Sequence, residues 1–253
     1  MQLSLKNSIG LIPAAGRGER LGFPFPKELY PVIENNQYRP VSHYILENMI
    51  EAGVKHISIV INDTKHQLIK YFGNGNRFGC DISYVVQELR KDDLHITRTP
   101  GLAEAMDTPY HLTKDKIVFF GMADTIIRPT NFFKIASEKL ADDVDVLLCL
   151  FHTDRPEKAG MVRLDEENWV HKIDDKPIKT DLEWMWGAMI WKPVFTNFFH
   201  SCIHTKQISD YAQIFNSAID SGIKFKGVGF ENGKYLDMGT YNDVLRLGKW
   251  LKN

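Results

Sequence analysis

The sequence predicts an α/β fold in which helices cover both faces of a mixed, mostly parallel sheet. From Ile9 to Phe151, short apolar segments rich in β-branched residues alternate with segments of helical period. Strands that alternate with helices form parallel pairs, because each crossover returns the chain in the same direction. The 253 residues are 43% hydrophobic and 25% charged, which is enough for one large core. We therefore predict a doubly wound sheet in a single domain, residues 1–253.

The first part of the chain supplies the repeating units. The expected strands are Ile9–Pro13, His56–Ile61, Ile82–Val86, Ile117–Gly121 and Val144–Phe151. The expected helices are Pro40–Ala52, Lys65–Phe72, Gly101–Leu112 and Asn131–Leu140. In doubly wound sheets the ligand binds outside the carboxyl ends of the strands, so we look for the functional site at that edge.

After Phe151 the sequence consists of shorter and less regular segments. Short pieces such as GMVRLD, VHKID and GAMIWK are bounded by turn residues, and helix-like stretches follow near Gln207–Ser221 and Tyr241–Lys252. No stretch rich in Ser, Gly or Pro separates this part from the first. We interpret it as a smaller mixed extension of the same domain.

Charge and composition exclude several classes of protein. The formal net charge is −1 with both signs interspersed, which argues against a nucleic-acid partner. No apolar run approaches the roughly 18 residues of a membrane span, and Met1–Ser8 lacks the apolar stretch of a signal peptide. Three scattered cysteines fit reduced thiols better than a disulfide framework. We expect a cytoplasmic protein without a membrane partner, in which a homo-oligomer is permitted but not indicated.

The loop after the first strand carries the strongest chemical signal. Ala14–Lys27 reads AAGRGERLGFPFPK and combines small residues, a G-x-G pair and two basic side chains. Glycine lets backbone N–H groups approach phosphate oxygens, while Arg20 and Lys27 supply positive charge to a phosphoryl group. The pattern therefore predicts a triphosphate site.

Two better-known phosphate loops do not fit. A dinucleotide fold needs G-x-G-x-x-G and an acid about twenty residues later, but the third glycine, Gly22, comes one place late and no acid is suitably placed. A Walker loop needs Gly-Lys-Ser/Thr, whereas Lys27 follows Pro26 and precedes Glu28.

Taken in order, these segments resemble the sugar-phosphate nucleotidyltransferases. Their opening motif, L-A-(A/G)-G-x-G-(T/S)-R-(L/M) followed by P-K, is similar to Ile12–Leu21 and Pro26–Val32. Further likenesses to family segments, nearly to the end of the chain, are FGNGNRFG at 72–79, Gln87 with the later Gly101-Leu102-Ala103, AGMV at 159–162, DKP at 175–177 and YLDMGT at 235–240.

The resemblance implies a Rossmann-like fold whose extension holds the sugar site, and transfer of a nucleoside monophosphate from an NTP, with UTP or dTTP favoured, to a sugar 1-phosphate. It implies catalytic roles for Arg20 and Lys27 and a Mg²⁺ site at Asp124 and Asp237. The implied nucleotide contacts are Ala14, Ala15, Gly16, Gly18, Gln87 and Gly101. The implied acceptor contacts are Gly160, Asp175 and Lys176. The resemblance thus names the partners as an NTP and a phosphorylated sugar or sugar-like alcohol.

The two acids also suit a metal by their own chemistry. Asp124 follows the apolar strand IVFFG, and Asp237 precedes the last expected helix. Mg²⁺ is usually held by one or two carboxylates together with substrate oxygens. Capping or turn roles are the alternatives for both residues.

Several departures leave the substrates open. Glu19 stands where the family has Thr or Ser, Ala123 replaces a Gly, and Asp175 replaces a Glu. The short spacing from Arg20 to Lys27 resembles the cytidylyltransferase that acts on methylerythritol phosphate. A CTP-dependent enzyme acting on a polyol or other alcohol phosphate therefore stays an alternative, as does a non-catalytic nucleotide-sensing domain. The loop Glu88–Pro100 is longer than the family usually has, and a lid and a solvated loop are equally compatible with it.

One remaining motif suggests a different metal. HSCIH offers His200, Cys202 and His204, and the two histidines stand at i and i+4, on the same face of a helix. No fourth ligand is evident in the sequence, and the spacing matches no zinc pattern. The sequence alone therefore argues against a metal here.

Overall fold

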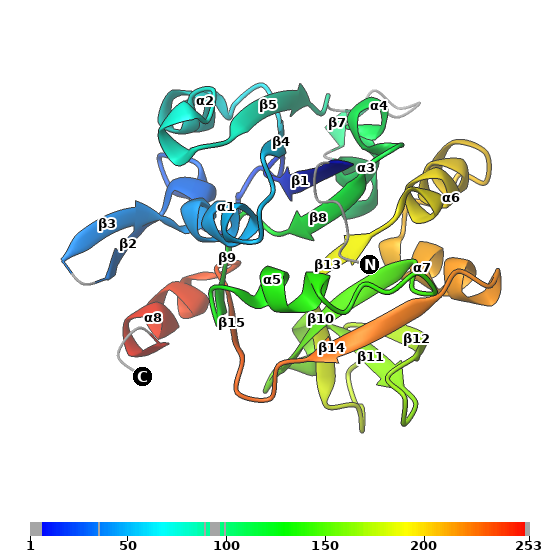
Figure 1. Cartoon of the computed structure of the whole chain (residues 1–253). Coiled ribbons are helices and arrows are strands. Elements are labelled where there is room, and N and C mark those ends of the chain that lie inside the picture. The colour runs from blue at the N-terminus through cyan, green and yellow to red at the C-terminus, as the bar shows by residue number, and fades with distance from the viewer. Residues whose placement is uncertain (1–6, 35, 89, 92–96, 99, 251–253) are drawn as a thin grey trace.

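The computed structural model describes residues 7–34, 36–88, 90–91, 97–98 and 100–250. Within these ranges a nine-stranded sheet runs through the centre of the molecule, in the order β12-β11-β13-β8-β1-β4-β5 with β10 paired to β13 and β14 (Figure 1). Four parallel strands form one half: β1 (Ser8–Pro13), β4 (His56–Ile61), β5 (Asp81–Val86) and β8 (Ile117–Gly121). This arrangement confirms the predicted fold class.

The other half of the sheet is mixed. It consists of β10 (Val146–His152), β11 (Gly160–Leu164), β12 (Val170–Asp175), β13 (Trp184–Trp191) and β14 (Phe225–Gly229). Strand β13 runs antiparallel to β8, β10 and β11, whereas β10 and β14 are parallel. The turn-bounded pieces of the second part thus extend the first sheet, which is the mixed extension that the sequence predicted.

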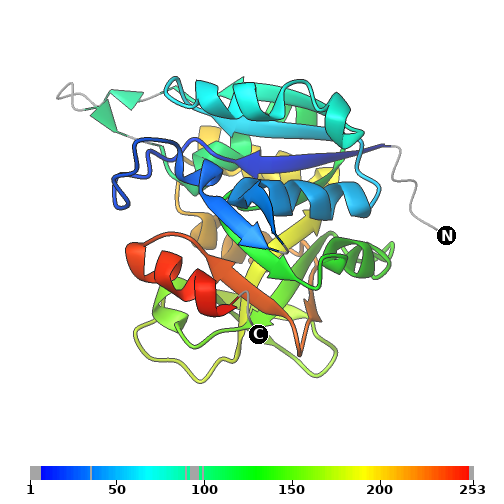
Figure 2. The same cartoon turned by 90° about the vertical axis from the view of Figure 1, so that its left-hand side faces the viewer.

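Alternating side chains of the central strands feed two separate cores. In β1, Leu11 packs into one buried cluster and Ile12 into the other, as period-two alternation requires. One face is covered by α1 (Val41–Glu51), α2 (His66–Phe72) and α5 (Phe132–Ser137). The opposite face is covered by α3 (Leu102–Asp107), α6 (Pro193–His204) and α7 (Tyr211–Asp220) (Figures 1 and 2). Helices on both faces make the sheet doubly wound.

The expected helix over Gly101–Leu112 is broken in two. It forms α3 and then α4 (Tyr110–Thr113), with Pro109 between them. Proline has no N–H to donate and its ring clashes with the preceding turn, so a continuous helix cannot pass through it. Helix α7 also begins later than expected, because the side chain of Asp210 caps it by accepting a 2.8 Å hydrogen bond from the Gln213 N–H.

Several short elements complete the chain. Two hairpin strands, β2 (Pro31–Glu34) and β3 (Gln37–Pro40), pair with each other, as do β9 (Thr125–Arg128) and β15 (Lys234–Asp237). Within the loop Glu88–Pro100 the structure describes the two end residues and the antiparallel pair β6 (Arg90–Lys91) and β7 (Thr97–Arg98). The other residues of the loop lie outside the described ranges, so a lid and a solvated loop stay open alternatives. The remaining elements are α8 (Tyr241–Trp250) and the single turns η2 (Lys27–Leu29), η3 (Asn76–Phe78) and η4 (Pro156–Lys158).

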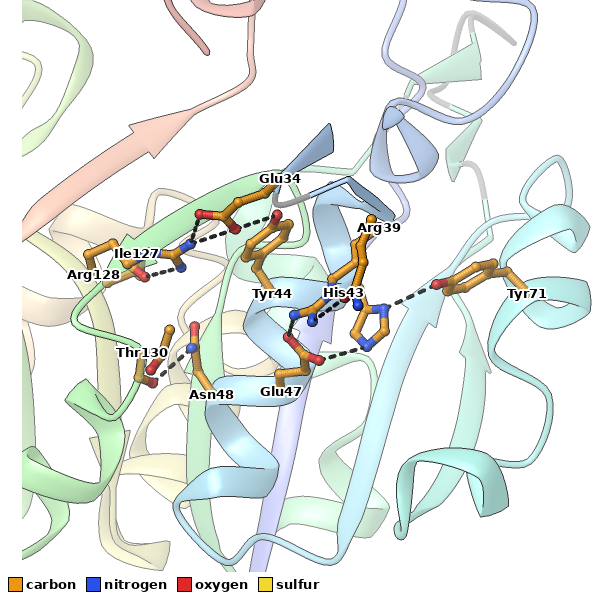
Figure 3. A network of polar contacts seen from close by, with 11 residues as sticks. Glu34, Arg39, His43, Tyr44, Glu47, Asn48, Tyr71, Ile127, Arg128 and Thr130 are labelled. Carbon is orange, nitrogen blue, oxygen red and sulfur yellow. Dashed lines mark hydrogen bonds and ion pairs between the residues drawn. The ribbon is translucent and has the colours of Figure 1, made fainter. Parts of the chain in front are cut away.

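A polar network braces β9 against α1 (Figure 3). Arg128, the last residue of β9, donates to both carboxylate oxygens of Glu34 at 2.9 and 3.0 Å, and the Tyr44 hydroxyl donates to the same carboxylate at 3.2 Å. Asn48 of α1 donates to the Thr130 carbonyl at 2.8 Å. The neighbouring residues drawn with this network are Arg39, His43, Glu47 and Tyr71. These bonds fix the segment that begins directly after Asp124.

In the part of the chain that the structure describes, no helix combines the length and the apolar character needed to cross a bilayer.

Candidate active site

A cavity of about 660 Å³ opens at the carboxyl ends of β8 and β10, where the fold class places ligands. Arg20 and Lys27 border it from the loop after β1, and Asp124 borders it from the segment after β8. Asp237, at the end of β15, lines the same cavity. The four residues that the sequence assigned to catalysis and metal binding therefore share one cavity.

The loop after β1 is held in place by its neighbours. Ala14 and Ala15 are buried; the Ala14 N–H donates to the Val60 carbonyl at 2.7 Å, and Asn62 donates to the Ala15 carbonyl at 2.6 Å. Gly18 has a φ of +69°, a conformation that a side chain rarely adopts. The loop thus turns sharply and then brings Arg20 to the cavity.

A buried ion pair anchors the base of Lys27. The adjacent Glu28 accepts a 2.6 Å hydrogen bond from Lys65, and both side chains are at most 2% exposed. The Ser42 hydroxyl also donates to the Glu28 carbonyl at 2.7 Å. Burial raises the pKa of Glu28, and the attraction of Lys65 partly offsets that rise. Removing either partner would leave a buried charge unpaired, which is strongly destabilising. The pair therefore fixes the position of Glu28 and, through the main chain, that of the neighbouring Lys27.

Two carboxylates and one ammonium group meet at the floor of the cavity. Lys27 donates to the Asp124 carboxylate, and these side chains are 17% and 7% exposed. Burial lowers the pKa of Lys27, but attraction and hydrogen bonding to Asp124 outweigh it and leave the pKa raised. Burial and repulsion by Asp124 raise the pKa of Asp237 to about 7. The site therefore holds more negative charge than one lysine neutralises.

A two-stranded ribbon brings the two acids together from distant parts of the chain. Strands β9 and β15 are antiparallel, with Asp237 opposite Thr125, the residue that follows Asp124. The Met238 N–H donates to the Asp124 carbonyl at 2.9 Å. The main chain therefore sets the separation of the two carboxylates.

The predicted acceptor residues lie on the other wall. Gly160 and Asp175 are paired across β11 and β12, and Gly160 and Lys176 line the cavity. Lys176 donates to the Asp175 carboxylate at 2.8 Å, and the Tyr211 hydroxyl donates to the same group. Burial and the negative charge of Asp175 raise the pKa of Tyr211. Asp175 thus positions a lysine and a tyrosine at the edge of the cavity.

Only glycine fits at position 160 without displacing a neighbouring side chain. A Cβ added there would lie 2.3 Å from Nε1 of Trp186 and 3.3 Å from the Tyr211 hydroxyl. Trp186 lines the cavity, and its buried Nε1 has no hydrogen-bond partner among the described residues. The glycine therefore allows an indole N–H to sit close to the ligand space.

Comparison with known sequences decides the family. The sequence profile of the nucleotidyl transferases matches residues 9–252. The chain belongs to the nucleotidyl transferase family. The resemblance inferred from the motifs is thereby confirmed.

Two relatives and one solved structure give the degree of likeness. The chain is 25% identical over 257 residues to glucose-1-phosphate thymidylyltransferase of Streptomyces antibioticus, covering 94% of this chain and 65% of that protein. It is 24% identical over 245 residues to the enzyme of the same name from Neisseria meningitidis, covering 93% and 79%. A Bacillus anthracis structure described as a glucose-1-phosphate thymidylyltransferase superposes with a TM-score of 0.81 at 18% identity, covering 97% and 96%. The chain thus spans just under two thirds of the Streptomyces relative.

None of the six predicted nucleotide contacts is among the residues that line the main cavity. Ala14, Ala15, Gly16 and Gly18 belong to the loop that carries Arg20 to it. Gln87 is 6% exposed and borders a second hollow of about 480 Å³, and its Nε2 has no hydrogen-bond partner among the described residues. Gly101 starts α3, where its N–H donates to Glu104 at 2.6 Å, and the next residue, Leu102, lines the main cavity. The assignment of all six residues to the nucleotide stays a prediction.

Sequence reasoning missed a group of basic residues at the cavity. Arg155, Lys158 and Arg246 line it together with Arg20, Lys27 and Lys176. Arg155 donates to the buried Asp243 of α8, and Arg246 donates to Asp154 at 2.5 Å. No motif groups these residues, because they come from the loop after β10 and from the last helix. A segment that joins Arg and Lys within DRPEK, directly after a buried strand, was the available signal.

Proposed function

We propose that the chain transfers a nucleoside monophosphate from an NTP, with dTTP or UTP favoured, to a sugar 1-phosphate and releases pyrophosphate. The observation that carries this proposal is the convergence of Asp124, Asp237, Arg20, Lys27 and Lys176 on one cavity. Six basic and three acidic side chains line the cavity, and this excess of positive charge suits two substrates that both carry phosphate. Relatives named for the transfer of thymidylate to glucose 1-phosphate support the same reaction class.

The proposed reaction needs no general base. An ionised oxygen of the sugar phosphate attacks the α-phosphorus, and a new phosphorus–oxygen bond forms. The bond from the α-phosphorus to the bridging oxygen breaks, and pyrophosphate leaves with that electron pair. Catalysis then consists of in-line placement and of offsetting charge on the phosphates. Arg20 and Lys27 supply that charge on the nucleotide side of the cavity.

Asp124 and Asp237 fit a divalent cation. Burial and mutual repulsion keep the pKa of Asp237 near 7, and a bound cation would relieve this repulsion. Oxygen ligands of this kind are those that Mg²⁺ prefers. The bound ion would supply charge neutralisation at the phosphates. Lys27, which contacts Asp124, adds a positive charge beside these carboxylates and would help to offset charge on the substrate phosphates.

The alternatives considered from the sequence receive less support. A CTP-dependent enzyme acting on a polyol or other alcohol phosphate is not favoured, since the relatives are named for glucose 1-phosphate. A non-catalytic nucleotide sensor would need neither the pair Asp124 and Asp237 nor the basic residues that line the cavity. We also propose that the protein works in the cytoplasm, where NTPs and sugar phosphates are made; Cys80, Cys149 and Cys202 are all buried free thiols.

The proposed function is tested by pyrophosphate release. ATP, GTP, CTP, UTP and dTTP are each combined with Mg²⁺ and with glucose 1-phosphate, another hexose 1-phosphate, a polyol phosphate or no acceptor. We expect release with dTTP or UTP and a hexose 1-phosphate. A preference for CTP with the polyol phosphate would select the alternative enzyme. Absence of release with every pair, while the NTP still binds, would select the sensor.

Lys176→Ala should weaken acceptor binding by roughly ten- to a hundredfold, the value of one charge-assisted hydrogen bond. NTP binding should stay within about twofold. Lys176 already has a φ of +49°, and alanine tolerates this conformation no better than lysine, so the backbone is not relaxed by the change. Separate calorimetric titrations of NTP and sugar phosphate measure both affinities. Lys179→Ala is the control, because Lys179 is exposed and does not border the cavity. Equal losses for both substrates would remove Lys176 from the acceptor site.

Gly160→Ala should raise the KM for the sugar phosphate at least about tenfold, because the added methyl group displaces the Trp186 indole. Overpacking of this kind also costs roughly 1 to 3 kcal/mol of stability, so the melting temperature should fall. Gly248→Ala is the matched control, since a Cβ at Gly248 meets nothing within 4 Å. A wild-type KM for the acceptor in Gly160→Ala would show that this wall does not face the sugar.

A further inference from the structure

A second cluster of chemically active side chains lies outside the cavity. Asp107 ends α3, and both histidines of the HSCIH motif lie on α6. The Asp107 carboxylate lies 2.9 and 3.1 Å from Nδ1 of His200 and 2.8 Å from Nε2 of His204. One ligand atom from each residue falls within 4.8 Å of the other two. A distant helix therefore supplies a carboxylate that the sequence did not connect with the two histidines.

The three side chains are held in place. His200 and His204 lie one helical turn apart, so their rings share one face of α6. The Tyr110 ring stacks on the His200 ring with centroids 3.7 Å apart and planes 5° apart. Asp107 is only 8% exposed at its side chain, whereas His204 is 55% exposed. Cys202, between the histidines, is fully buried in the core and takes no part. The cluster is fixed on the protein side and accessible on the other.

We propose that Asp107, His200 and His204 bind a divalent transition-metal ion such as Zn²⁺. Imidazole nitrogen and carboxylate oxygen bind Zn²⁺ at about 2.0 to 2.2 Å, and in a tetrahedral site such ligand atoms lie roughly 3.4 Å apart. The Asp107 oxygens lie 2.8 to 3.1 Å from the two ring nitrogens, and all three ligand atoms lie within 4.8 Å of one another, so a small rearrangement would accommodate the ion. Two imidazoles and one carboxylate leave the fourth position to water, and all three residues border the hollow of about 480 Å³.

The donor set distinguishes this site from the proposed Mg²⁺ site. Mg²⁺ prefers oxygen ligands and keeps several waters, whereas imidazole favours zinc, copper or nickel. Each imidazole must offer an unprotonated nitrogen to the metal and carry its proton on the other ring nitrogen. The metal would replace hydrogen bonds that now join α3 to α6. Since Leu102 begins α3 and lines the main cavity, the ion would also tie one wall of that cavity to α6.

Zn²⁺ alone is the probe in the test. The chain is stripped with chelator and titrated with Zn²⁺ by calorimetry in the presence of excess Mg²⁺, and melting temperatures are measured with and without Zn²⁺. Co²⁺ in place of Zn²⁺ reports the coordination geometry through its visible absorption. We expect one equivalent of tightly bound Zn²⁺, a rise in melting temperature, and a Co²⁺ spectrum of tetrahedral type.

Variants separate a metal site from a purely structural ion pair. In His204→Gln the amide can still donate to Asp107 but cannot replace the imidazole as a zinc ligand. We therefore expect its melting temperature in chelator to equal that of the wild type, while Zn²⁺ affinity falls at least about tenfold. His56→Gln is the control, because His56 also faces an aspartate, Asp81, at 3.5 Å but belongs to no group of three such ligands among the described residues. Asp124→Asn should keep the zinc site.

The outcomes are distinct. Zn²⁺ binding that survives in His204→Gln would place the ion elsewhere and overturn the proposal. Loss of that binding in Asp124→Asn would then place the ion in the main cavity. Absence of saturable Zn²⁺ binding to the wild type would reduce the cluster to hydrogen bonds between Asp107 and the two histidines.

Discussion

Asp124→Asn and Asp237→Asn are each expected to lower turnover roughly a thousandfold or more, at saturating Mg²⁺. Both carboxylates line the cavity, and the main-chain pairing of β9 with β15 fixes how they face each other. An amide is nearly the same size but carries no charge, so it weakens the hold on a divalent cation without leaving a void. Steady-state pyrophosphate release over a range of Mg²⁺ concentrations measures the loss.

The fold should survive these changes. Asp237 carries a carboxylate that is repelled by Asp124, so Asp237→Asn removes an unfavourable interaction when no metal is present. Its melting temperature at pH 8 in chelator should therefore be no lower than that of the wild type. Asp154→Asn is the matched control: Asp154 borders the same cavity, but its side chain is 71% exposed and pairs with Arg246. If either cavity variant turned over as fast as Asp154→Asn, that residue would not be a metal ligand.

Arg20→Ala should lower kcat by on the order of a hundredfold or more, with a smaller effect on NTP affinity. Arg20 lies in the loop after β1 and borders the cavity together with Lys27 from the same loop. Its charge should matter most while the pyrophosphate is leaving, because negative charge builds up on the departing oxygens. Initial rates at saturating concentrations of both substrates give kcat, and calorimetry gives the affinity for the NTP.

Arg17 provides the comparison for Arg20. It lies in the same loop, pairs with Glu19 at 3.2 Å and does not line the cavity. Arg17→Ala should therefore keep kcat within about threefold. A change in KM alone for Arg20→Ala would assign Arg20 to binding of the ground state.

The central architecture was readable from residue patterns because burial on both faces makes a strand almost continuously apolar. HISIVI at 56–61 and IVFFG at 117–121 form strands with the predicted bounds. The ends of helices were less well predicted, since single residues such as Pro109 and Asp210 decide them. Strands β9 and β15 were not foreseen, because each has the other as its strand partner and the two stand more than a hundred residues apart in the sequence.

The same limit applies to the side chains of the cavity. Asp124 and Asp237 could be named because each stands in a recognisable motif at the end of an apolar segment. Arg155 could not, because its place depends on the buried Asp243 in the last helix. Likewise Asp107 has no motif of its own, and only the packing of α3 on α6 brings it to two histidines. Local pattern identifies a ligand, but tertiary packing decides which ligands meet.

The ribbon of β9 and β15 has a consequence for how far such a protein can diverge. Its hydrogen bonds join backbone groups, which every amino acid except proline supplies in full. Substitutions along the ribbon can therefore accumulate while Asp237 stays beside the residue that follows Asp124. A deletion of one residue in either strand would instead turn its side chains to the opposite face and separate the pair. Insertions and deletions, rather than substitutions, should thus mark the lineages that have lost the activity.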